Sequence, residues 1–83
     1  MTVIIDGREY SAETATGLIN EIKGMHWQAG ADTTPEEYIA MQERTYRKMM
    51  RRRMKLPKGD TETRAKAMFK AVADTGAWIY KEG

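Results

Sequence analysis

The residues of this chain whose types and spacing best suit chemistry are the basic side chains between positions 44 and 58. This stretch holds eight of the fourteen lysines and arginines and no acid. Five of them recur at intervals of three and four residues: Arg44, Arg47, Lys48, Arg51 and Lys55. A continuous helix would align these five along about 16 Å of one face. Such a row binds anions, and the pattern therefore indicates a surface for an acidic partner, either a protein or a nucleic acid.

The rest of the chain is acidic or balanced. Residues 1–43 carry eight acids against Arg8 and Lys23, a net charge of −6, whereas residues 59–83 carry four charges of each sign. The formal net charge of +2 therefore conceals a segregated distribution. A solvated helix face stays open as the alternative, because cations near the C-terminal end of a helix are stabilised by its dipole. Acids in residues 1–43 could also neutralise some of the cations within the fold.

Groups suited to catalysis or metal binding are few. His26 is the only histidine and there is no cysteine, so the chain lacks the ligands of an ordinary zinc site. Ser11, the only serine, is better placed to cap a helix than to act as a nucleophile. Glu36 and Glu37 would project about 100° apart on a helix, which is a poor arrangement for sharing one reacting atom. We therefore expect no enzyme, no metal and no cofactor.

Three aromatic residues are candidates for an interface: Trp27, Trp78 and Tyr80. Trp27 lies on the polar side of the first expected helix if that helix is regular, and packs inward if Gly24 ends or bends it. Trp78 and Tyr80 would share one face of a strand, where they either cover the core or stack on RNA bases. Together with the methionines they also suit a self-interface. A self-associating structural protein is therefore the alternative function, and we expect a monomer or a homodimer.

A hairpin is expected at the N-terminus. The dipeptide Asp6-Gly7 supplies the two positive-φ positions of a type I′ turn, and the residues around it favour strands. This predicts a hairpin over residues 2–10. The two-residue loop sets Val3 opposite Tyr10, with both side chains facing the core.

Three amphipathic segments predict helices over residues 12–27, 35–53 and 61–75. Ser11 is the expected N-cap of the first helix. Thr34 and Glu37, with proline between them, form the pattern of a capping box for the second helix. Asp60 is the expected cap of the third.

Helical wheels predict which sides of the second and third helices are buried. The apolar side of the second helix comprises Tyr38, Ile39, Tyr46, Met49 and Met50. This helix should end near residues 52–54, because Arg53 interrupts its apolar side. The buried stripe of the third helix comprises Ala65, Met68, Phe69 and Val72, and its opposite side carries Lys66, Lys70 and Asp74.

The segment 77–81 is compatible with a third strand beside the hairpin, and a tail that simply packs down is the alternative. The whole chain is thus predicted to be one small α+β domain, 1–83, with an N-terminal hairpin followed by three helices. Apolar runs such as Val3-Ile4-Ile5 are far shorter than the roughly 20 residues of a membrane span. We expect a cytoplasmic protein without a membrane role. The layout resembles the small accessory proteins of bacteria and their phages.

Overall fold

A two-residue turn sets the N-terminal hairpin in the computed structural model, which describes residues 1–25, 30 and 32–82. Asp6 and Gly7 have φ angles of 52° and 82°, as a type I′ turn requires. They join β1 (Thr2–Ile5) to β2 (Arg8–Ser11). Val3 lies opposite Tyr10, so the expected register is confirmed.

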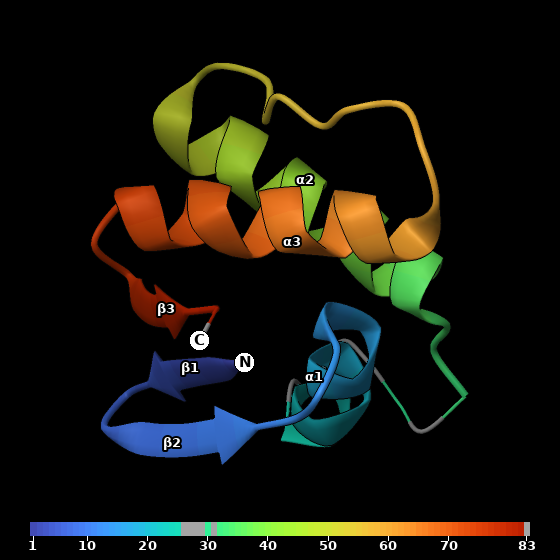
Figure 1. Cartoon of the computed structure of the whole chain (residues 1–83). Coiled ribbons are helices and arrows are strands. Elements are labelled where there is room, and N and C mark those ends of the chain that lie inside the picture. The colour runs from blue at the N-terminus through green and yellow to red at the C-terminus, as the bar shows by residue number, and fades with distance from the viewer. Residues whose placement is uncertain (26–29, 31, 83) are drawn as a thin grey trace.

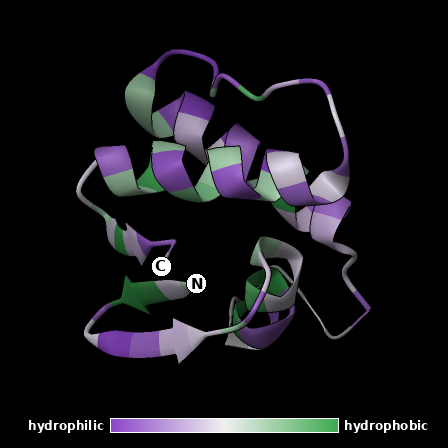
Figure 2. Cartoon of the chain, viewed as in Figure 1, coloured by the Kyte–Doolittle hydropathy of each residue, from purple (hydrophilic) through white to green (hydrophobic). Residues whose placement is uncertain are grey.

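The third strand is also present. β3 (Trp78–Lys81) pairs antiparallel with β1 and completes a sheet of order β2-β1-β3. The two ends of the chain therefore lie close together (Figure 1). β1 is the hydrophobic central strand (Figure 2), and its residues Val3 and Ile5 are buried on the inner face of the sheet. On the outer face Ile4 pairs with Ile79, which is 55% exposed.

The first helix begins later than expected. α1 spans Ala15–Ile22 and is capped by Thr14, whose hydroxyl accepts a hydrogen bond from the Gly17 N–H at 3.0 Å. Ser11 is not the cap: it belongs to β2, with its hydroxyl 3.1 Å from that of Thr2. Strand pairing continues past Ser11, because the N–H of residue 12 donates to the carbonyl of Met1 at 3.0 Å. Extended backbone there delays the helix.

The end of the first helix is only partly described. A 3₁₀ turn, η1 (Lys23–Met25), follows α1. The expected helix 12–27 is therefore α-helical only to residue 22. The 3₁₀ turn that follows contains Gly24, the residue at which the sequence allowed the helix to end or bend. The last two residues of the expected helix lie outside the described part of the chain.

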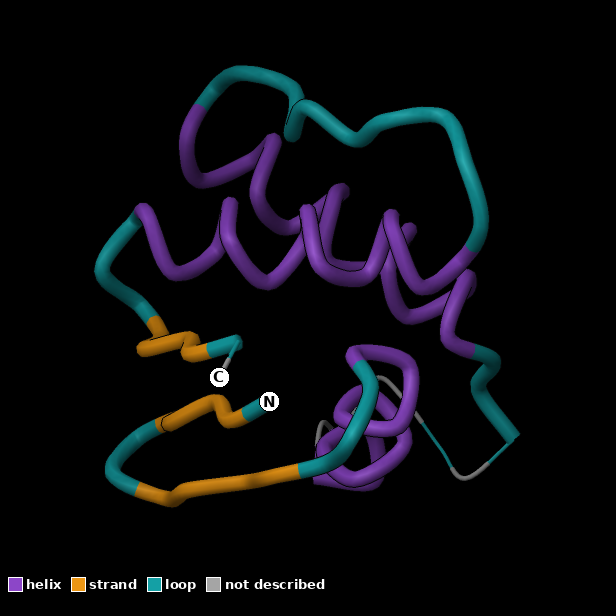
Figure 3. The backbone as a smooth tube through the Cα atoms, in the orientation of Figure 1, coloured by secondary structure: helices purple, strands orange, loops and turns teal. Residues whose placement is uncertain are grey.

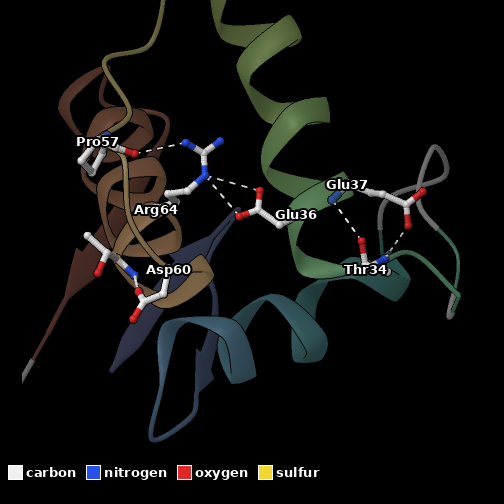
Figure 4. A network of polar contacts seen from close by, with 7 residues as sticks. Thr34, Glu36, Glu37, Pro57, Asp60 and Arg64 are labelled. Atoms are coloured by element: carbon white, nitrogen blue, oxygen red, sulfur yellow. Dashed lines mark hydrogen bonds and ion pairs between the residues drawn. The ribbon is translucent and has the colours of Figure 1, made fainter.

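The other two helices start at their expected caps (Figure 4). α2 spans Pro35–Met50, and its capping box is complete: the Glu37 N–H donates to the Thr34 hydroxyl at 3.2 Å and the Thr34 N–H donates to Glu37 Oε1 at 3.0 Å. α3 spans Thr61–Asp74, with the Asp60 carboxylate accepting from the Thr63 N–H at 2.8 Å. α2 ends at Met50, before its expected limit of residue 53, and α3 ends at Asp74, one residue before its expected limit.

α3 is the central element of the fold. It contacts α2, α1 and β3 and lies in front of α2 and above the sheet in Figure 1. Its buried residues are those that its sequence pattern predicts: Ala65, Met68, Phe69 and Val72. The Phe69 ring stacks on Tyr80 of β3, with the ring centres 5.2 Å apart and the planes at 13°. This contact joins the helical layer to the sheet.

Glu62 links α3 to α1. Its Oε2 accepts the N–H of Ala15 at 2.7 Å, and its Oε1 accepts the N–H of Thr16 at 2.9 Å and the Thr16 hydroxyl at 3.1 Å. The carboxylate of α3 thus caps α1, because it accepts hydrogen bonds from N–H groups that have no partner within α1. Desolvation raises the pKa of Glu62, but the hydrogen bonds from Thr16 and Ala15 together outweigh it and hold the pKa below its ordinary value.

We expect Glu62→Gln to lower the free energy of unfolding by about 1–2 kcal/mol at neutral pH, because an amide offers one acceptor where the carboxylate offers two. A carboxyl pKa lowered by folding adds stability above its unfolded value of about 4.3, and this contribution is lost as the pH falls through the folded value. The difference in the free energy of unfolding between the variant and wild type should therefore become smaller at acid pH. Urea unfolding followed by circular dichroism measures it.

The matched control is Glu21→Gln, an exposed glutamate on α1, which should change stability by less than about 0.5 kcal/mol. Equal effects of the two substitutions at neutral pH would contradict the capping role of Glu62.

Candidate functional site

The outer face of α2 carries the first part of the basic stretch. Arg44, Arg47 and Lys48 are exposed, whereas Tyr38 and Ile39 on the inner face are fully buried. The three cations therefore share the outer face that their spacing predicts. An ion pair spans one turn of this face, with Arg47 Nε 3.4 Å from Glu43 Oε2.

The row of five cations does not continue along the helix. Arg51 adopts a left-handed φ of 56° and ends α2, its N–H donating to the Arg47 carbonyl at 2.9 Å. Lys55 therefore lies in the following loop and not on the helix face. α2 ends here because a regular helix continued to residue 53 would place Arg53 at the centre of its buried side. The break instead brings Met54 into the core, where it is 5% exposed.

The loop of residues 51–60 returns from the end of α2 to the start of α3 (Figure 3). The helices consequently run in the same direction, with Arg64 Nε near the start of α3 bonding Glu36 Oε1 near the start of α2 at 3.2 Å. The same arginine donates from its terminal nitrogen to the Pro57 carbonyl at 3.1 Å (Figure 4). Together with the burial of Met54, this bond holds the loop against the domain.

We use the name basic surface for the eight cations of α2 and this loop: Arg44, Arg47, Lys48, Arg51, Arg52, Arg53, Lys55 and Lys58. All eight are exposed. Within the described residues, Arg47 is the one member with an acid at salt-bridge distance. The acids of residues 1–43 therefore leave most of this charge unneutralised in the described part of the fold, and the segregation seen in the sequence persists on the surface.

Two hollows share Tyr46 in their walls. The basic hollow, of about 540 Å³, is lined by Arg52, Arg53, Lys55 and Lys70 with Asp74, besides Tyr46 and two alanines. The apolar pocket, of about 150 Å³, is lined mainly by Met49, Met50, Val72, Ala77 and Trp78. Arg52 contacts this shared residue: its Nε donates to the Tyr46 hydroxyl at 3.2 Å, and its guanidinium carbon lies 5.9 Å from the centre of the ring.

The interface candidates Trp78 and Tyr80 face the core. Both are half-buried, and the Trp78 ring centre lies 6.0 Å from that of Phe69, which also stacks on Tyr80. Desolvation, reinforced by the negative charges of Glu82 and Glu62, raises the pKa of Tyr80 to about 12, so its hydroxyl stays neutral at physiological pH. These rings cover the core more than they form an open platform for bases. Trp27 and His26 lie outside the described residues.

Sequence reasoning missed several members of the two hollows. Met49 was expected on the buried side of α2, yet it is 70% exposed, because α3 and β3 leave the pocket open beside it. Arg52 and Arg53 were assigned only to the end of the helix. Lys70 was seen as part of the polar face of α3, but no local signal shows that this face lies opposite the loop.

Among the described side chains, no cluster of three or more histidines, aspartates or glutamates is arranged to hold a metal ion. No helix in the described ranges combines the length and apolar character that crossing a membrane demands.

The role of Met54 in holding the loop of residues 51–60 can be tested by comparing this buried methionine with the exposed Met49. Met54→Ala should lower the free energy of unfolding by about 2–3 kcal/mol, because it removes a buried side chain and leaves a cavity. Met49→Ala, the matched exposed control, should cost less than about 0.5 kcal/mol. Urea denaturation of both variants decides the matter, and a Met54→Ala variant as stable as wild type would show that the loop is not held by this contact.

Comparison of the chain with protein-family models, with curated protein sequences and with solved structures found no match.

Proposed function

We propose that this protein is a non-enzymatic binding module whose basic surface contacts an acidic partner, a protein or a nucleic acid. One observation carries the proposal. Seven of the eight exposed cations, all but Arg47, have no acid at salt-bridge distance among the described residues, although the loop that bears five of them is anchored to the domain by Met54 and Pro57. Like charges held close together repel one another, and an acidic partner relieves that repulsion.

The backbone at Arg51 adds support. A left-handed conformation costs a residue with a side chain about 1–2 kcal/mol, whereas glycine adopts it freely. The chain nevertheless has arginine at this position, with a φ of 56°. Strain of this kind is tolerated where a side chain serves a purpose beyond the fold, and the exposed guanidinium of Arg51 belongs to the basic surface.

The charge requirement can be tested with Arg44→Gln plus Lys48→Gln. Both side chains are exposed and form no described ion pair, so the fold should persist. The probes are poly-L-glutamate and a random-sequence DNA duplex, titrated by fluorescence anisotropy between about 50 and 200 mM salt. Wild type should bind both probes, and its affinity for them should fall steeply as the salt concentration rises. If both side chains contact phosphates, the plot of log affinity for the duplex against log salt concentration should become less steep, with its slope less negative by about 1.8.

The control is Arg8→Gln plus Lys81→Gln, which makes the same change in net charge on the sheet, outside the basic surface. It should leave the slope nearly unchanged. Equal losses in the two double variants, or no binding of either probe by wild type at about 50 mM salt, would remove the proposal.

Arg51→Gly separates stability from binding at one position. Glycine relieves the left-handed strain but has more freedom to lose on folding, so we expect the free energy of unfolding to rise by about 0.5 kcal/mol. Binding of the same probes should weaken, because one cation of the surface is lost. Thermal or urea unfolding together with the anisotropy titration measures both effects. A variant that is less stable than wild type would show that Arg51 is not strained.

A cytoplasmic location, the absence of enzymatic activity and the choice between monomer and homodimer stay predictions from the sequence.

A further inference from the structure

The apolar pocket is an open feature of the surface. It lies between the second half of α2, the end of α3 and the start of β3, and Met49 at its edge is 70% exposed. Its volume of about 150 Å³ matches an engineered cavity in another protein that holds benzene. Its methionines, Met49 and Met50, have flexible, polarisable side chains that adapt to the shape of a partner. The pocket thus has room for one apolar side chain.

The basic hollow adjoins this pocket. Tyr46 lines both, with its hydroxyl held by Arg52. Two of the four cations in the hollow already have partners: Arg52 donates to the Tyr46 hydroxyl, and Lys70 Nζ is 3.1 Å from Glu82 Oε1. Asp74 also lines the hollow and adds a negative charge there. Arg53 and Lys55 have no acid at salt-bridge distance among the described residues. An anionic group entering the hollow would meet these two.

The two hollows together present an apolar site next to a cationic one. A nucleic acid would satisfy the cations, but its bases call for open aromatic stacking surfaces and hydrogen bonds to their edges. Of the two aromatic rings in the pocket wall, Trp78 is half-buried and packs against Phe69. The other, Tyr46, has the Arg52 guanidinium 5.9 Å from its ring centre. A protein segment that carries an apolar side chain within one or two turns of several carboxylates satisfies both parts. Charge complementarity and the apolar lining therefore favour the same class of partner.

We infer that the partner is a short acidic amphipathic protein segment, which inserts one apolar side chain into the pocket beside Met49 and Trp78 and places its carboxylates against Arg53 and Lys55. This inference rests on the proposed function and names its partner class. The apolar contact supplies selectivity among acidic partners, and the cations supply attraction and its salt dependence.

The probe is a synthetic helical peptide with one central phenylalanine among glutamates, and the reference is the same peptide with alanine in place of phenylalanine. Both have the same charge, so they should show the same salt dependence on the intact protein. The phenylalanine peptide should bind at least about tenfold more tightly, because only its anchor buries apolar surface in the pocket. A single-stranded DNA of matched charge is the third ligand.

Met49→Gln tests the pocket while keeping the length of the side chain and the net charge. On this variant the tenfold ratio between the two peptides should fall below about threefold. Such a loss in a double-mutant cycle shows that the anchor and Met49 interact. Ile79→Gln is the matched control, since it removes another exposed apolar side chain, on the outer face of the sheet, and should leave the ratio unchanged. Circular dichroism establishes that both variants fold.

Three outcomes would overturn the inference, and they separate it from the proposed function. Equal, salt-dependent affinities of wild type for the two peptides would leave a basic binding surface without an apolar anchor site. Tighter binding of the DNA than of the phenylalanine peptide at the same salt concentration would favour a nucleic acid partner. If neither peptide nor the DNA binds at about 50 mM salt, the proposed function fails together with the inference.

Discussion

The carboxylate of Glu62 is the contact on which the arrangement of the helices depends. It lies in the first turn of α3 and accepts the first N–H groups of α1, so the N-terminal ends of these two helices must meet. The ion pair of Arg64 with Glu36 brings the start of α2 to the start of α3. The three positive ends of the helix dipoles are thereby gathered near acidic side chains, which stabilise them. The C-terminal ends of α2 and α3 lie away from these contacts, and five of the eight cations of the basic surface follow the end of α2 in the loop of residues 51–60.

The parallel direction of α2 and α3 explains why the basic residues form a surface of this shape. Neighbouring helices that run the same way need a connection as long as the helix, and residues 51–60 provide it (Figure 3). A loop of arginines and lysines would be mobile if only solvent surrounded it. Burial of Met54 and the bond from Arg64 to Pro57 hold it in place. The cations are therefore presented by a return connection that the packing of two helices makes necessary.

The elements that were predicted correctly depend on interactions between residues close in the chain. The Asp6-Gly7 turn, the capping box of Thr34 and Glu37, and the Asp60 cap each form within three residues. The failures depend on distant partners. Ser11 belongs to a strand because β1 pairs with it, and α2 stops at Met50 because Met54, and not Arg53, fits the core. Met49 is exposed because no described element covers it.

By itself the sequence determined the α+β class, the caps of α2 and α3, the buried stripe of α3 and the concentration of positive charge between residues 44 and 58. The tertiary structure alone decided that Arg44, Arg47 and Lys48 are separated from Lys55, which lies in the basic hollow opposite Lys70 of α3. It also decided that an apolar pocket opens beside that hollow. Local hydrogen bonds are encoded over three or four residues, whereas a hollow exists only where segments distant in the chain meet, and their relative placement is set by the packing of the whole core.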